Sequence, residues 1–390
     1  MNRVLVLDAM QRSALATTRS LGAKGIELFT ADESATSLAG SSRFSQEYFS
    51  YPSPRLHPEK FIDTISDIAK QQGITILMPM TELTTQLLLE HQSKFPDIHI
   101  PFPPLSVVNS LADKCQLMKM AKTLNIPIPK TWYVDDLKKL PCELDELPYP
   151  LVLKPGKSWI FYQNQWRRAA VRIAKDAQEV LSIFNSDWAF KAHPFMMQEC
   201  VAGEGAGVFA IYDQGMPLAL FAHRRLREKP PSGGVSVLSE SATVDLELAL
   251  PAQKLLDNVG WHGVAMVEFK VSPDGTPYLM EINTRFWGSL QLAIDAGVDF
   301  PYLLYKITCG ETTESVDSYK TGIKLRWLLG DLDNLYLNLR DRQLPMSKKL
   351  LAISTFLLPT SGKTRHEVNR WSDLKPFWWE VKQYVRDLRS

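Results

Sequence analysis

Hydrophobic and polar positions alternate between a strand pattern and a helix pattern along the first hundred residues. Continuous apolar runs at 3–9, 26–32 and 74–80 predict strands, and the segments between them have apolar residues at helical spacing. Strands that alternate with helices predict a parallel, doubly wound α/β unit over residues 1–110. No G-x-G-x-x-G turn follows the first strand, so the fingerprint of a dinucleotide site is absent.

The end of the third predicted strand is a candidate binding position. Ligands in doubly wound sheets bind beyond the carboxyl ends of the strands, and Thr81 and Glu82 follow that strand directly. An acidic residue at an exposed helix start explains Glu82 equally well, so both readings stay open.

The pattern changes after the proline-rich segment at 101–105. An amphipathic helix within 111–132 that Pro127 and Pro129 end, a buried strand over 149–158 and further strands predict a second, mixed domain over 111–335. The remaining residues, 336–390, are rich in Arg, Lys and Trp and have helical spacing, which predicts a basic helical extension. The fold class is therefore α/β, or α+β for the chain as a whole.

A predicted hairpin in the second domain carries an unusual row of polar residues. Asp274-Gly275 is a strong turn signal, and folding the chain symmetrically about it sets Glu268 opposite Glu281. Since side chains two apart in a strand share a face, Glu281, Asn283 and Arg285 should form one row. Met280, Ile282 and Thr284 should then point to the other face.

Two carboxylates that face each other in a sheet repel, so something must compensate them. A proton, a basic side chain or a bridging cation would each do so. Glu268 and Glu281 with the amide oxygen of Asn283 offer the oxygen ligands that Mg²⁺ prefers, and Arg285 could stabilise a phosphoryl group. The alternative is a solvated strand face with ordinary surface salt bridges.

Composition and charge narrow the classes of function. Hydrophobic residues make up 45% of the 390 residues and the net charge is +1, so no overall field favours nucleic acid, and we expect no nucleic-acid partner. The four cysteines are far apart, which predicts neither a zinc site nor disulfides and suits a cytoplasmic location. We expect no signal peptide and no transmembrane segment.

Five segments in order resemble the ATP-grasp family, specifically its carboxylate–amine ligases, over about residues 1–310. The segments are "ADKCQLMKMAKTLNIPIP", "YPLVLKP", "MMQECVAGEGAGVFAI", "GVAMVEFK" and "YLMEINTRFWGSLQLAIDAG". The resemblance implies a pre-ATP-grasp domain at 1–110, an ATP-grasp domain at 111–335 and the extension at 336–390.

The resemblance also implies roles for particular residues. Lys114 and Lys154 match the lysines that contact ATP phosphates. The adenine hinge and the ribose-binding acid match Gln198, Glu199, Val201 and Glu204. The ligands of Mg²⁺ (or Mn²⁺) match Glu268, Glu281 and Asn283, and Arg285 matches the arginine beside the transferred phosphate.

Two segments need separate interpretation. The family's mobile glycine-rich loop corresponds here to "PGKSWIFYQNQWRRAAVRI", which has one glycine and several aromatic residues. A basic loop over 222–237 is expected above the active site, and we expect Arg225 or Arg227 to bind the substrate carboxylate or acyl phosphate. An ordinary basic surface loop is the alternative.

These observations predict an ATP-dependent ligase that joins a carboxylate to an amine through an acyl phosphate. The alternatives are a kinase that uses the same site on a small acceptor and a non-catalytic nucleotide-binding scaffold. A homodimer is a further expectation. The basic extension suits either a cap whose tryptophans pack on the main body or a membrane-surface or protein contact.

Overall fold

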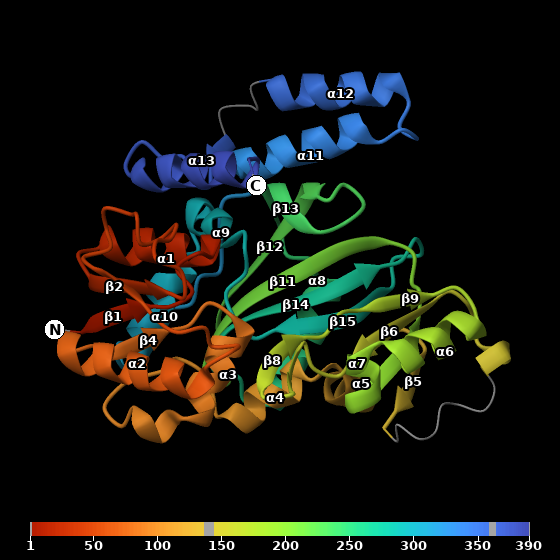
Figure 1. Ribbon diagram of the computed structural model, residues 1–390, viewed down its shortest axis with the longest axis horizontal. Helices are drawn as coiled ribbons and strands as arrows, with labels where there is room; N and C mark the ends of the chain where they lie inside the picture. The colour runs from red at the N-terminus through yellow and green to blue at the C-terminus, as the bar shows by residue number, and fades with distance from the viewer. Residues whose placement is uncertain (1, 136–143, 359–363, 390) are drawn as a thin grey trace.

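The computed structural model describes residues 2–135, 144–358 and 364–389. Three parts follow one another along the chain: an N-terminal α/β unit, a small antiparallel sheet with a larger, mainly antiparallel sheet, and C-terminal helices that lie over one end of the larger sheet (Figure 1). The predicted α/β class is confirmed. The predicted domain boundaries stay predictions, although α11 runs across the one placed between 335 and 336.

The N-terminal unit is a parallel sheet with strand order β3-β2-β1-β4, covered by helices. The three strands predicted from apolar runs are present, and their central residues are fully buried because both faces of the sheet are covered. Beyond β1, the carboxylate of Asp8 accepts the backbone N–H groups of Met80 and Thr81, which fixes the start of α3. The elements are β1 (Arg3–Val6), α1 (Arg12–Gly22), β2 (Glu27–Asp32), β3 (Tyr48–Ser50), α2 (Pro58–Gln72), β4 (Ile76–Met78), α3 (Glu82–Glu90), a 3₁₀ turn (Gln92–Lys94) and α4 (Leu105–Ala112).

A small antiparallel sheet with strand order β5-β10-β6-β9 follows, with helices on one side. The chain between β6 and β9 forms a separate two-stranded hairpin, β7–β8. The elements are α5 (Lys114–Thr123), β5 (Thr131–Val134), a 3₁₀ turn (Leu144–Glu146), β6 (Leu151–Pro155), β7 (Trp159–Tyr162), β8 (Gln165–Arg168), β9 (Arg172–Ala174), α6 (Ala177–Ser186), α7 (Trp188–Ala192) and β10 (Phe195–Glu199).

The larger sheet has seven strands in the order β15-β14-β11-β12-β13-β16-β17. Its core contains the fully buried rings of Phe209, Phe221 and Trp261. The elements are β11 (Glu204–Asp213), β12 (Met216–Lys229), β13 (Val235–Ala242), α8 (Leu246–Asn258), β14 (Gly263–Val271), β15 (Pro277–Asn283), α9 (Leu290–Ala296), α10 (Phe300–Thr308), β16 (Lys324–Arg326) and β17 (Thr364–His366).

The extension was predicted to be helical throughout, and this is wrong in one part, because β17 adds an edge strand to the larger sheet. Its helices are α11 (Leu328–Arg340), α12 (Met346–Leu357) and α13 (Lys375–Asp387). The segment after β17 is joined to the N-terminal unit: Arg12 pairs with Glu367, and Arg19 pairs with buried Asp373 at 3.0 Å. Removing one partner of such a buried pair typically costs about 3–5 kcal/mol, so the extension is part of the main body.

The tryptophans of the extension divide into two kinds. Trp379 packs against the main body and its Nε1 donates to Thr36. Trp371 and Trp378 are 93% and 59% exposed, so the expectation that the tryptophans pack as a cap is wrong for these two. No helix among the described residues is long and apolar enough to cross a membrane.

Candidate active site

The predicted pairing of Glu268 with Glu281 is confirmed. Strands β14 and β15 are antiparallel, and the two glutamates are direct partners, with Met266 opposite Asn283. The register shifts just beyond Glu268, toward the turn. This bulge gives Met280 a place beside the site, where its sulfur lies 3.9 Å from Lys154 Nζ, and the expectation that Met280 faces away is therefore wrong.

The facing carboxylates are compensated by basic side chains and an amide. Lys114 Nζ lies 3.4 Å from Glu281 Oε2, and Arg225 Nη2 lies 3.3 Å from Glu268 Oε2. The amide nitrogen of Asn283 donates to Glu268 at 2.9 Å and to Glu281 at 3.4 Å. The row predicted from sequence is thus one half-buried cluster of paired charges rather than a fully solvated strand face.

The two carboxyl groups differ in their affinity for a proton. Burial and the charge of Glu281 raise the pKa of Glu268, against the opposing effect of Arg225. Burial acts in the same direction on Glu281, but Lys114 and Lys154 outweigh it and hold the pKa of Glu281 below its ordinary value. Glu281 is therefore the more firmly ionised member of the pair.

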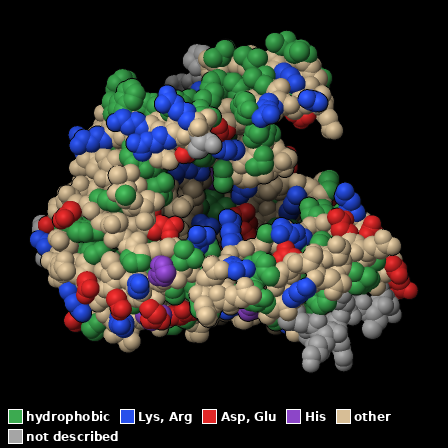
Figure 2. All heavy atoms as spheres, in the orientation of Figure 1, with side chains coloured by type: hydrophobic (Ala, Val, Ile, Leu, Met, Phe, Trp, Pro, Cys, Tyr) green, Lys and Arg blue, Asp and Glu red, His purple; other side chains and the backbone are tan. Residues whose placement is uncertain are grey.

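The two predicted phosphate lysines approach from the small sheet. Lys114 begins α5, where the Asp113 side chain caps the helix, and its ammonium group donates to Ser158 Oγ at 2.9 Å. Lys154 lies in β6, and burial lowers its pKa to about 8, against the opposing effect of Glu281. Both lysines thus face the carboxylates of the larger sheet. Figure 2 shows a hollow at the centre of the molecule whose walls carry Lys, Arg, Asp and Glu side chains.

Arg285 and Glu82 complete the cluster. Arg285 lies just beyond β15, where Nη2 donates to Asn283 Oδ1 at 3.1 Å and Nη1 donates to the carbonyl of Phe286. Burial raises the pKa of Glu82, and Lys114 and Arg285 act in the opposite direction. The first residue of α3 therefore belongs to this site, and the N-terminal unit contributes to it as strand-end reasoning suggested.

The predicted adenine hinge lies where β10 ends. The Gln198 side chain is 1% exposed and donates to Thr131, and Glu199 accepts the backbone N–H of Lys130 at 3.0 Å. The link that follows leaves Val201 half-buried and Glu204 exposed. Gly203 has a φ of 144°, and a Cβ there would lie 2.0 Å from the carbonyl oxygen of Val271, so the link requires glycine at this point. The nucleotide roles of these residues stay predictions.

The segment predicted as a basic loop over 222–237 is a β-hairpin, and this expectation is wrong. Strand β12 continues to Lys229 and pairs with β13, with register shifts on either side of Arg227. Because of these bulges, the two arginines separate. Arg225 reaches Glu268 across Gly205 of β11, whereas Arg227 Nη2 pairs with Asp331 of α11 at 2.6 Å.

The glycine-poor segment after Lys154 is also a folded hairpin. Its turn residues, Gln163 and Asn164, have φ values of 50° and 60°, which match the right-handed twist of a two-residue hairpin turn. The backbone N–H of Trp166 donates to the carbonyl of Arg55 at 2.9 Å, and so the hairpin is anchored to the N-terminal unit. Its aromatic rings pack in pairs, Phe161 against Trp166 and Tyr162 against Trp188 of α7.

The donor set of the cluster fits a hard divalent cation. Among the described residues no three His, Cys, Asp or Glu side chains gather as a metal site. The third candidate oxygen is Asn283 Oδ1, which accepts from Arg285 while the amide nitrogen donates to both carboxylates, so the amide must turn over to offer its oxygen to a cation. Carboxylate and amide oxygens beside paired lysines suit an ion that is shared with phosphate groups.

Comparison with known proteins identifies the fold. Residues 191–330 match the family described as ATP-grasp in the biosynthetic pathway with Ter operon. Biotin carboxylase from Campylobacter jejuni is similar with a TM-score of 0.64 at 15% identity, covering 82% of this chain and 74% of that chain. L-amino acid ligase from Bacillus licheniformis has a TM-score of 0.60 at 15% identity, covering 80% of this chain and 75% of that chain. N5-carboxyaminoimidazole synthetase from Staphylococcus aureus is similar with a TM-score of 0.61 at 13% identity, covering 83% of this chain and 80% of that chain.

At these identities the solved structures show the fold alone, which is the ATP-grasp fold. The match to the family model covers residues 191–330, so this segment is similar to the ATP-grasp family, in line with the sequence resemblance. A comparison with curated protein sequences gives no match.

Proposed function

We propose that the protein is an ATP-dependent ligase that joins a carboxylate to an amine through an acyl phosphate. The observation that carries the proposal is the cluster of Glu268, Glu281 and Asn283 between Lys114 and Arg225. Opposed carboxylates held by an amide and flanked by cations are suited to phosphoryl transfer, where catalysis consists mainly of positioning and charge stabilisation. The proposal is also supported by two structures of the same fold, one described as a biotin carboxylase ATP complex and the other as an L-amino acid ligase.

Each residue of the cluster has a proposed part in binding. Lys114 and Lys154 bind the phosphates of ATP, and the link after β10 with Glu204 holds the nucleoside. Glu268, Glu281 and Asn283 would hold Mg²⁺, which neutralises phosphate charge when bound. Arg285, fixed by Asn283 and by the carbonyl of Phe286, stabilises the charge on the transferring group.

The reaction proceeds in two displacements. A carboxylate oxygen of the substrate bonds to the γ-phosphorus while the bond to the bridging oxygen breaks and ADP leaves. The amine nitrogen then bonds to the acyl carbon, loses a proton, and displaces phosphate. The β7–β8 hairpin, packed against the N-terminal unit, helps to keep water from the acyl phosphate.

An ADP-release screen over pairs of acids and amines, with mass spectrometry of the products, tests the proposal. The expected result is ADP release that requires both partners and yields an amide. A phosphorylated product that resists hydroxylamine would favour the kinase alternative instead. Tight nucleotide binding without turnover on any pair would favour the scaffold. A cytoplasmic location and a homodimer remain part of the proposal.

A further inference from the structure

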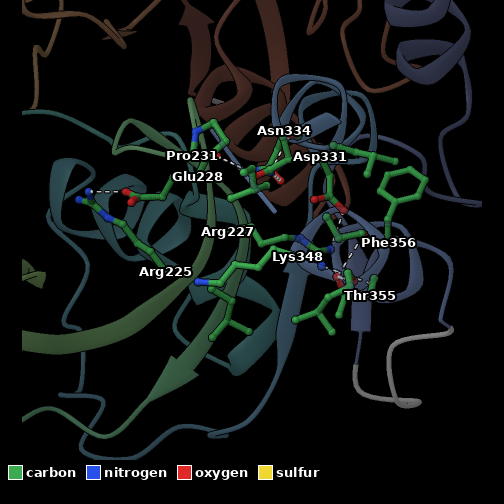
Figure 3. Close-up of a pocket in the computed structure, with 15 residues that line it drawn as sticks. Arg225, Arg227, Glu228, Pro231, Asp331, Asn334, Lys348, Thr355 and Phe356 are labelled. Atoms are coloured by element: carbon green, nitrogen blue, oxygen red, sulfur yellow. Dashed lines mark hydrogen bonds and ion pairs between the residues drawn. The ribbon is translucent and has the colours of Figure 1, made fainter. Parts of the chain in front are cut away.

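The C-terminal helices and the β12–β13 hairpin enclose a second hollow beside the carboxylate cluster. It has a volume of about 360 Å³, and its walls come from β12, the turn after it, α11 and α12 (Figure 3). Small-molecule sites typically range from about 300 to 1,000 Å³, so this pocket suits a small ligand. Arg225, which contacts Glu268, also lines the pocket and so links it to the proposed phosphoryl-transfer centre.

The charged groups of the pocket are unevenly compensated. Asp331 is 1% exposed and accepts from both Arg227 and Arg326 at 2.6 Å, so its negative charge is already neutralised within the wall. The guanidinium of Arg225 is shared between Glu228 at 3.2 Å and Glu268 at 3.3 Å. The exposed Lys348 of α12 extends its ammonium group toward the side of the pocket on which Arg225 lies (Figure 3). The edge of the pocket nearest the carboxylate cluster thus carries Arg225, which two carboxylates already offset, and Lys348, for which the described residues supply no ion pair.

The rest of the lining is apolar or carries amides. Leu226, Leu351 and Phe356 supply apolar surface, and Asn334 and Asn338 supply carboxamide groups. A site of this kind recognises a molecule with a charged end and an amphipathic body, because a few placed polar groups orient a ligand within apolar walls.

We propose that this pocket binds the carboxylate substrate, with the carboxylate at the Arg225–Lys348 edge and the body of the acid between α11 and α12. This inference rests on the proposed function, because it names the substrate class of that site. It assigns selection of the acid to the C-terminal extension and makes Lys348 a specificity residue. Nucleotide binding is left to the two sheets.

Lys348→Ala tests the assignment, with Lys349→Ala as the matched control. Both lysines are on α12, but Lys349 donates to the carbonyl of Leu339 and does not line the pocket. The probe is 4-(trifluoromethyl)benzoate, followed by ¹⁹F NMR, with the neutral 4-(trifluoromethyl)benzamide for comparison. Loss of one charge-assisted contact should weaken benzoate binding roughly tenfold or more in Lys348→Ala and leave it unchanged in Lys349→Ala.

Binding of a fluorescent ATP analogue separates this inference from the proposed function. It should be the same in both variants and in the unmodified protein. Benzoate binding that is unaltered in Lys348→Ala, matched by the benzamide, or absent altogether would overturn the pocket assignment, whatever the ATP result. If the benzoate result holds but no acid–amine pair releases ADP, the ligase proposal fails while the anion pocket stands.

Discussion

Two hairpins of the larger sheet carry polar or charged residues two positions apart, and they place them differently. In β14–β15 the register is intact through Glu281 and Asn283, and both meet Glu268 on one face. In β12–β13 the register shifts between Arg225 and Arg227, and the arginines contact different partners. The two-residue period therefore predicts a shared face only where no bulge intervenes.

The comparison divides the predicted arginines into two roles. Arg225 belongs with the carboxylates of the site, whereas Arg227 neutralises buried Asp331 and donates to the carbonyl of Thr355 at 3.3 Å. A bulge thus gives two arginines of one strand different partners, and we propose that Arg225 serves the chemistry and Arg227 the structure. Substitutions in the two hairpins should separate these roles.

The largest effect is expected from the β14–β15 hairpin. Glu281→Gln keeps the size of the side chain but removes the charge that Lys114 faces and that a cation would need. Loss of metal-assisted charge stabilisation is worth several kcal/mol, so ATP turnover should fall by roughly a thousandfold. Asn283→Ala should do the same, measured as ADP release with the acid–amine pair found in the screen.

Glu247→Gln, on the exposed first turn of α8, is the control for charge removal and should keep full turnover. Wild-type rates in either site variant would falsify the metal assignment.

The second prediction separates the two arginines of the bulged hairpin. Arg225→Ala should lower turnover by about a hundredfold or more while ATP binding stays nearly intact, because Glu268 then loses its ion-pair partner. Arg227→Ala should instead lower the free energy of unfolding by up to about 3 kcal/mol, since buried Asp331 then retains only Arg326. Steady-state kinetics and denaturant unfolding of both variants measure the difference. Turnover that falls equally in both, with no loss of stability in either, would show that the bulge does not separate their roles.

The sequence predicts the elements well but not their irregularities. Apolar runs identify the buried strands of the N-terminal unit, and Asp274-Gly275 fixes the register that brings Glu268 to Glu281. Bulges have no comparable signal, so neither the place of Met280 nor the divergence of Arg225 and Arg227 could be read from spacing. The sequence gives no sign that Lys348 and Asp331 lie near β12, because only the folded α11 and α12 bring them there.

The sequence after Lys154 does contain a signal for a β-hairpin, although the segment lacks the glycines of the family's loop. Aromatic residues flank Gln163-Asn164, and asparagine tolerates the left-handed backbone that a tight turn needs. A comparison based on glycine content alone therefore misses a β-hairpin that local turn chemistry favours.

The third prediction concerns pH. The pKa of Lys154 is lowered to about 8 by burial, so the free protein loses this charge as pH rises through that value. ATP should bind the protonated form, and its affinity should fall by up to roughly tenfold per unit above pH 8. Titration of nucleotide binding between pH 6.5 and 9.5 measures it. Lys154→Arg, which stays charged throughout, should flatten the profile, and an unchanged slope in that variant would assign the titration to another group.

The smallest effect should come from the strand that separates the two hairpins. Arg225 reaches Glu268 across β11, and a Cβ at Gly205 would lie 3.9 Å from Arg225 Nη1, an ordinary contact. Gly205→Ala should therefore be nearly neutral, whereas the larger side chain of Gly205→Leu should displace the guanidinium and lower turnover by a few-fold to roughly tenfold, less than Arg225→Ala does. If both variants keep full turnover, Arg225 does not act through Glu268. A combined Gly205→Leu and Arg225→Ala protein, no slower than Arg225→Ala alone, would show that the leucine acts only through the arginine, since coupled residues are non-additive.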